Sequence, residues 1–210
     1  MLLENLLKTH PKEYELNANL AVAYELNGQL DTALALLKRS MAINPRSHYD
    51  SEWFHLNILE SAITLRDKQL APHDISVLRI VQDTFNKKIG YQISHQLRER
   101  IPLSQSPNKL LSKAIEECGD YYHAHISLEW AIELYAIAIG YSDDSITKMK
   151  LWDKINSSRQ KLIDFKSQGK KGSVAKYLYK SIWQKKINQR INKWSGYTPY
   201  YYDKAIKTTF

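Results

Sequence analysis

Small and large side chains recur at fixed spacings between residues 20 and 45, in the sequence LAVAYELNGQLDTALALLKRSMAINP. Small residues at Ala21, Ala33 and Ser40 allow two antiparallel helices to approach closely. The large side chains that fill the space around them are Leu20, Tyr24, Leu30 and Leu37. Gly28 supplies a turn between the two helices, and Pro45 follows the end of the second. The stretch therefore predicts a tightly packed helix pair.

A degenerate version of the same pattern occupies residues 113–144, KAIEECGDYYHAHISLEWAIELYAIAIGYSDD. Its matching positions are Cys118, Gly119, Tyr122, Ala131, Tyr135 and Ala138. Ile126 stands where the turn glycine is expected, and Asp143 stands where the closing proline is expected. The equivalent residues Ala21 and Gly119 are 98 positions apart, which is close to three periods of about 34 residues.

Both stretches resemble the tetratricopeptide repeat, near residues 14–47 and 112–145. The middle stretch SHYDSEWFHLNILESAI, followed by YQISHQLRERIPL, resembles a group of uncharacterised bacterial tetratricopeptide proteins. These resemblances cover roughly residues 15–142. They imply an all-α fold in which antiparallel helix pairs stack as a right-handed superhelix. The expected array spans residues 1–168, with divergent helices between the two repeats, and is followed by a basic, Tyr-rich segment at 169–210.

Apolar periodicity along the rest of the chain predicts further helices. Together with the two repeats, the expected helices lie near 2–8, 12–27, 30–43, 49–67, 74–87, 91–100, 108–122, 126–140, 145–167 and 173–194. For the helix near 74–87 the apolar stripe consists of Ile75, Leu78, Val81 and Phe85. No segment alternates between apolar and polar residues for long enough to require a strand, and no phosphate-binding glycine pattern is present.

The resemblance also implies a binding surface, because the first helix of each tetratricopeptide pair lines a concave groove. By carry-over, the groove positions are Glu15, Asn19, Val22, Glu25, Lys113, Glu116, Glu117, Asp120 and His123. Asn19 matches the position at which peptide-binding repeats often place an asparagine. The mixture is polar and mostly acidic, which favours a protein partner with a basic or extended polar segment. The alternative is that these side chains form an ordinary solvated helix face.

Metal binding and catalysis have weaker support. The pairs His95/Glu99 and His125/Glu129 have helical spacing for two metal ligands each, but no third ligand accompanies either pair. Cys118 with His123 or His125 is the one conceivable nucleophile pair, although Cys118 falls at a packing position of the repeat. The sequence therefore predicts a scaffold with no catalytic residues, no metal and no cofactor. The aromatic stretch Trp53, Phe54 and His55 is interpreted as core.

The basic character of the chain is concentrated at its C-terminal end. From residue 170 onward there are ten Lys or Arg residues and one acid, Asp203, in a chain of net charge +8. The apolar stripe Leu178, Ile182, Ile187, Ile191 and Trp194 predicts a basic amphipathic helix. One interpretation is a helix that caps the array. The alternative is binding to nucleic acid or an anionic surface through Lys180, Lys186, Arg190, Lys193, Tyr200 and Tyr201.

Compartment is left open by the sequence. No run of about 18 apolar residues predicts a transmembrane helix. The first fifteen residues contain Glu4 and no long apolar region, so no signal peptide is expected within them. The default expectation is the cytoplasm, or the periplasm if an export signal preceding Met1 has been removed.

Overall fold

The structure consists of helices. The computed structural model describes residues 2–79 and 87–167, and none of these residues lies in a β-strand. The predicted all-α class is therefore confirmed. The chain divides into two compact units, Met1–Gln96 and Leu97–Phe210. None of the described helices is long and apolar enough to cross a membrane.

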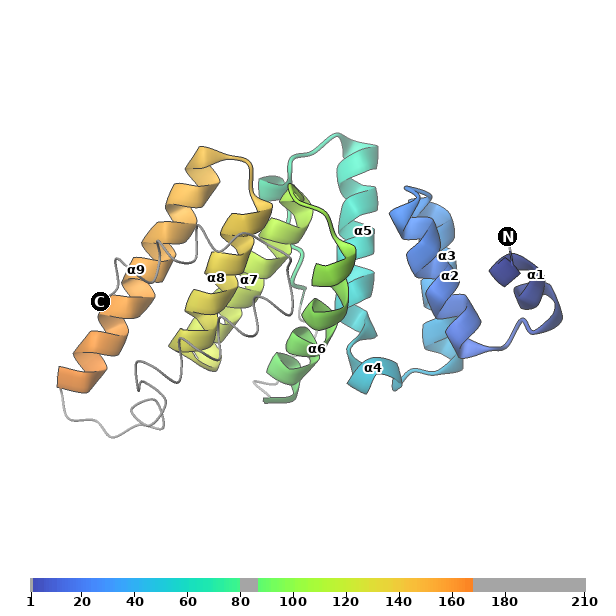
Figure 1. Ribbon diagram of the computed structural model, residues 1–210, viewed down its shortest axis with the longest axis horizontal. Helices are drawn as coiled ribbons and strands as arrows, with labels where there is room; N and C mark the ends of the chain where they lie inside the picture. The colour runs from blue at the N-terminus through green and yellow to red at the C-terminus, as the bar shows by residue number, and fades with distance from the viewer. Residues whose placement is uncertain (1, 80–86, 168–210) are drawn as a thin grey trace. The chain divides into compact units, whose positions relative to one another are not determined.

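The first unit contains the clearest helix pair. Its elements are α1 (Leu2–Thr9), α2 (Tyr14–Leu26), α3 (Leu30–Ile43), α4 (Ser47–Asp50), α5 (Glu52–Lys68), a single 3-10 turn (Pro72–Asp74) and the first part of α6 (Lys87–Leu103). Helices α2 and α3 lie side by side, and α5 packs against α3 (Figure 1). The helices expected at 12–27 and 30–43 are thus confirmed as α2 and α3.

Small residues bring α2 and α3 together as the sequence predicts. Ala21 and Ala33 are fully buried and share one core cluster with Leu37 and Leu59 of α5. Gly28 has a φ of +76°, a left-handed conformation that glycine adopts at no steric cost, and it forms the turn between the helices. This pair has the geometry that its residue spacing predicts.

The helix expected near 74–87 is wrong over its described part. Pro72–Asp74 forms only one 3-10 turn, and the backbone of Ile75 is extended. The segment instead bonds to α5: Asn57 Nδ2 donates to the carbonyl oxygen of Arg79 at 3.1 Å, and Arg79 Nη2 donates to Glu60 at 3.2 Å. Val77 is fully buried. Residues 75–79 therefore form an irregular strap that Arg79 holds on α5, and not a helix, while Val81 and Phe85 lie outside the described residues.

The second unit contains another antiparallel pair. Helices α7 (Lys109–His125) and α8 (Leu128–Tyr141) pack against each other, and α9 (Ser145–Ser167) packs on α8. The Asn108 side chain caps α7 by accepting a hydrogen bond from the backbone N–H of Leu111. The Ser127 side chain caps α8 in the same way, by accepting a hydrogen bond from the backbone N–H of Trp130. The second repeat has no turn glycine, and here the Ser127 cap marks the start of α8 instead. The expected pair at 108–122 and 126–140 is confirmed, whereas the right-handed stacking of successive pairs and the domain boundary at 168 stay predictions.

Candidate interaction surface

The expected groove positions on α2 divide into two groups. Glu15 and Asn19 are exposed to solvent and remain available to a partner. Val22 and Glu25 are partly buried, and the Glu25 carboxylate lies 2.8 Å from Nε2 of His55 on α5. The exposed part of the α2 face is therefore its N-terminal half, and Glu25 lies where α2 meets α5.

Histidines and carboxylates gather between α2 and α5, in a group called here the α2–α5 cluster: Tyr14, Glu25, His48, Glu52 and His55. Glu52 is only 5% exposed. Its carboxylate accepts a hydrogen bond from the Tyr14 hydroxyl at 3.1 Å and lies 3.0 Å from Nδ1 of His48. Nδ1 of His55 is 3.4 Å from the same carboxylate. These contacts join α2, α4 and α5 at one buried charge.

The cluster keeps Glu52 ionised. Burial alone would raise the pKa of the Glu52 carboxyl, since a buried charge loses its hydration. Hydrogen bonds from His48 and His55 outweigh burial and hold that pKa well below the usual glutamate range. Glu52 therefore carries its negative charge throughout the physiological range of pH.

A strained turn lies beside this cluster. His48, Tyr49 and Asp50 have φ values of 47°, 60° and 60°, and left-handed conformation costs a residue with a side chain about 1–2 kcal/mol. Several contacts hold the turn: His48 faces Glu52, Ser51 Oγ donates to the His48 carbonyl, and Gln92 of α6 donates to the Tyr49 carbonyl at 3.3 Å. The single helix expected at 49–67 is consequently split into α4 and α5.

The expected core residues of this stretch occupy different environments. Phe54 is fully buried and His55 is 5% exposed, so the interpretation of both as interior residues is confirmed. Trp53 is only partly buried, and its Nε1 donates to Gln92 Oε1 at 3.0 Å. His55 nevertheless differs from an ordinary core residue, because it lies between two carboxylates.

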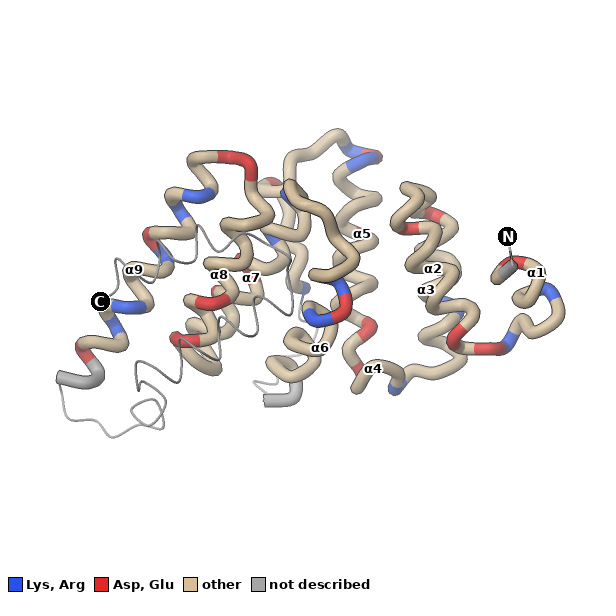
Figure 2. The backbone as a smooth tube through the Cα atoms, in the orientation of Figure 1, with Lys and Arg blue, Asp and Glu red and all other residues tan. Residues whose placement is uncertain are grey.

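In the second unit, the expected groove positions on α7 are paired with lysines. Nζ of Lys154 on α9 lies 2.7 Å from both Glu116 and Asp120, and Lys113 lies 3.4 Å from Glu117 on its own helix. Basic positions recur along α9 (Figure 2). Lysines thus balance much of the acidic charge expected on this face. The sequence-based expectation of a mostly acidic groove took account of the α7 side chains alone. Because Lys154 of α9 pairs with the α7 acids, this unit gives less support for a basic partner.

A shallow cavity of about 230 Å³ opens between these helices. Its lining residues are Asp120, His123, Tyr135, Lys154 and Ser157. The Tyr135 hydroxyl donates to Asp120 at 2.8 Å. Burial, followed by this hydrogen bond, raises the pKa of Tyr135, so its phenol remains protonated.

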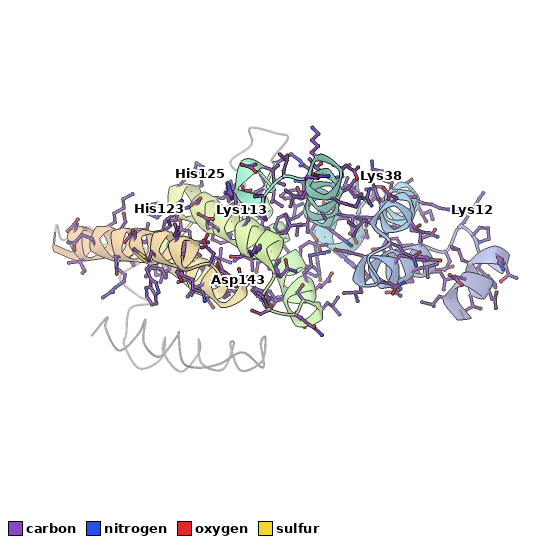
Figure 3. The ribbon with its side chains drawn as sticks, turned by 90° about the horizontal axis from the view of Figure 1, so that it is seen from above. Lys12, Lys38, Lys113, His123, His125 and Asp143 are labelled. Atoms are coloured by element: carbon purple, nitrogen blue, oxygen red, sulfur yellow. The ribbon has the colours of Figure 1, made fainter. Side chains whose placement is uncertain are left out.

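His123 is held by α9. It projects from α7, as does Lys113 (Figure 3). Lys161 Nζ lies 2.7 Å from its Nε2, and Ser158 Oγ lies 2.7 Å from its Nδ1. Burial, and then the positive charge of Lys161, lower the pKa of His123 and favour a neutral ring. Nε2 therefore accepts a hydrogen bond from the Lys161 ammonium group, while Nδ1–H donates to the Ser158 hydroxyl oxygen.

The candidate nucleophile Cys118 is a packing residue. It is fully buried in α7. Burial raises the pKa of its thiol, and the negative charges of Glu117 and Asp120 raise it further. A protonated thiol is a poor nucleophile, so these surroundings favour the structural role predicted for Cys118.

The two candidate metal-ligand pairs, His95/Glu99 and His125/Glu129, have no third ligand beside them in the described part of the chain. Within residues 2–79 and 87–167, no three His, Cys, Asp or Glu side chains are placed to hold one metal ion. His125 packs against Tyr121, with ring centroids 5.1 Å apart, and His95 packs against Tyr49 at 4.8 Å. The tail residues of the alternative function, Lys180, Lys186, Arg190, Lys193, Tyr200 and Tyr201, lie outside the described residues.

Comparison with known proteins identifies the N-terminal part of the chain. Residues 1–53 match the family model of the tetratricopeptide repeat. This match covers α1–α4 and the first residues of α5, including the α2–α3 pair and its small-residue crossing. Residues 1–53 are therefore similar to a tetratricopeptide repeat, a module that generally mediates protein–protein interaction. Searches of curated proteins and of solved structures returned no match.

Proposed function

We propose that the protein is a non-catalytic scaffold that binds a protein partner along the first helices of its repeats. The observation that carries this proposal is the tetratricopeptide match over residues 1–53, together with the exposed polar side chains of α2 within it. Glu15 and Asn19 are one turn apart on α2, so both project from one face. An extended segment would receive a hydrogen-bonding amide and a carboxylate from this face.

The partner is best described as an extended polar segment. The α2 face offers Glu15 as an exposed acid, which suits a basic side chain of the partner. In the second unit, Lys154 and Lys113 already pair with the acids of α7, so that unit suits a partner of mixed charge. Binding through the basic segment 169–210 stays a prediction from the sequence.

Removing the two exposed α2 side chains tests this function. We expect the double variant Glu15→Ala, Asn19→Ala to capture the partner from a lysate of the source cells about tenfold less efficiently than wild type, as loss of central interface contacts does. Its unfolding free energy should change by less than about 0.5 kcal/mol, because both side chains are exposed. Capture is measured by quantitative mass spectrometry of the retained proteins.

The matched control lies on the second helix of the same repeat. Thr32 and Arg39 are exposed on α3, and the double variant Thr32→Ala, Arg39→Ala should retain wild-type capture. Equal capture by wild type and both double variants would contradict the assignment of the binding face to α2.

A further inference from the structure

Helix α9 uses two of its sides within the second unit. Leu151, Ile155 and Leu162 are buried, and α9 packs on α8 (Figure 1). A neighbouring side carries Lys154 and Lys161, whose ammonium groups contact side chains of α7. A further helix of this unit would therefore have to pack on a third side of α9.

That third side is apolar, and within the described part of the chain it is open to solvent. We call it the α9 outer face, and its large side chains are Ile146, Met149, Trp152 and Ile163. Ile146, Met149 and Ile163 are 64%, 67% and 55% exposed, and Trp152 is partly buried. At 3.6 residues per turn, the four side chains fall within an arc of about 120°. Apolar side chains gathered in this way mark a surface that another segment covers.

The chain itself supplies a segment of suitable length. Residues 168–210 follow α9 directly, and Gly169 and Gly172 predict a turn before the amphipathic helix expected at 173–194. Comparably short connections join α2 to α3 and α7 to α8. The order of α9, turn and expected helix is thus the order found in the two described pairs.

One face of the expected helix carries large, mainly apolar side chains. At helical spacing these fall within an arc of about 100°, and they are Tyr177, Ile187, Ile191 and Trp194. Leu178 and Ile182, the other two residues of the predicted stripe, fall on the opposite side. The face that could cover α9 is therefore defined by the first four residues.

The α7–α8 pair shows how residues match across such a turn. Gly119 and Tyr135 meet where the two helices cross, and each is eight positions from Ser127 in the connection. Residues that meet in an antiparallel pair thus lie at nearly equal distances along the chain from the turn.

The same count, made from residue 170 at the middle of 168–172, matches the two apolar faces. In each match the two distances from residue 170 differ by at most one position. The matched residues are Ile163 with Tyr177, Trp152 with Ile187, Met149 with Ile191, and Ile146 with Trp194. Polar residues match as well: Gln160 and Asn156, both exposed on α9, stand opposite Lys180 and Gln184. Apolar residues are therefore opposite apolar ones along the whole length of the pair.

We propose that residues 173–194 pack as an antiparallel helix on the α9 outer face and form a third helix pair with α9. The driving force is removal of the two apolar faces from water. This pairing goes beyond the scaffold function, because it needs no partner protein. The domain boundary expected at residue 168 then falls within a helix pair.

Paired cysteines in the full-length chain test the match. Met149→Cys with Ile191→Cys is the matched pair, and Ile163→Cys with Ile191→Cys is the control, since positions 149 and 163 are about 21 Å apart along α9. We expect the matched pair to form an intramolecular disulfide under mild oxidation at least about tenfold faster, because a disulfide requires Cα atoms within about 7 Å. Native Cys118 is fully buried and does not compete. Non-reducing electrophoresis and mass spectrometry of the peptides measure both rates.

The control pair is closer in sequence than the matched pair, so a segment that did not dock would form the control disulfide at least as fast. Equal rates, or a faster control, would overturn the proposal. Disulfides between two chains in the matched variant would show that a second copy covers the α9 outer face, and would also overturn it.

Hydrogen exchange tests the docking without introduced cysteines. In the full-length variant Ile187→Asp, Ile191→Asp we expect protection of peptides from α9 to fall by about tenfold, and protection of α2 and α3 to stay unchanged. The matched control is Lys185→Asp, Gln189→Asp, which has the same spacing on the opposite side of the expected helix and should keep wild-type protection. Wild-type protection of α9 in the folded Ile187→Asp, Ile191→Asp chain would contradict the pairing. If that chain does not fold, the cysteine pairs decide.

Discussion

Replacing Glu52 with alanine should lower the unfolding free energy by about 3–5 kcal/mol, the range for removing one member of a buried ion pair. The Glu52 side chain is 6% exposed, and three groups meet its carboxylate: the Tyr14 hydroxyl, His48 and His55. Its loss leaves these groups without their shared acceptor and leaves the left-handed turn less well held. Urea denaturation followed by circular dichroism measures the change.

Glu60 provides the control on the same helix. Its side chain is 35% exposed and pairs with Lys38 and Arg79 at 3.1 and 3.2 Å. Because solvent screens such pairs, Glu60→Ala should cost no more than about 1 kcal/mol. Similar losses for Glu52→Ala and Glu60→Ala would show that the α2–α5 cluster does not carry the stability assigned to it.

The Glu52 carboxylate should also make the stability of the folded protein depend on pH. The folded-state pKa of Glu52 is lower than that of the unfolded chain, so the folded protein releases this proton more readily. The contribution of Glu52 is therefore fully present above the unfolded glutamate pKa of about 4.3 and is lost as pH falls toward the folded-state value. In Glu52→Ala this part of the acid sensitivity should be missing.

Gly119→Ala should destabilise the second unit by about 1–3 kcal/mol, the usual cost of overpacking. A Cβ atom at this position would lie 2.5 Å from Cε1 of Tyr135. Tyr135 is 1% exposed and its hydroxyl bonds to Asp120, so the ring has little freedom to move away. In an open helix the same substitution would stabilise by about 1 kcal/mol, and here we expect the clash to dominate. Thermal unfolding followed by circular dichroism measures the difference.

A double-mutant cycle identifies the clash as the cause. In a Tyr135→Ala background the ring is absent, so adding Gly119→Ala should be neutral or stabilising. A loss of the same size in both backgrounds would mean that Gly119 and Tyr135 do not form the crossing between α7 and α8.

The helix pairs could be predicted because their determinants are local. Ala21 and Ala33 are twelve positions apart, and their spacing alone indicates that two helices cross at these residues. The same spacing argument predicts that Gly119 lies where the two helices of the degenerate pair cross. Fold class follows from such spacings because close approach of helices requires small residues wherever it occurs.

The chemistry between helices could not be predicted in this way. Glu25 and His55 are 30 residues apart, and Lys154 is 34 residues from Asp120, so neither pairing has a spacing signal. The left-handed turn at His48–Asp50 contains no glycine to indicate it. The strap at residues 75–79 carries apolar spacing typical of a helix, yet contacts with Asn57 and Glu60 determine its path. A carboxylate such as Glu25 therefore resembles a solvent-facing groove residue until its neighbour is known.

Site-specific photo-crosslinking is the most direct test of the scaffold function. A photoreactive amino acid replaces Asn19 on α2 in one version of the full-length protein and Arg39 on α3 in another, and both are irradiated in a lysate of the source cells. We expect position 19 to yield one dominant crosslinked protein, with the attachment mapped to an extended polar segment, and position 39 to yield none of it. The same crosslinked protein at both positions, or no crosslinked protein at position 19, would contradict binding along the first helix of the repeat.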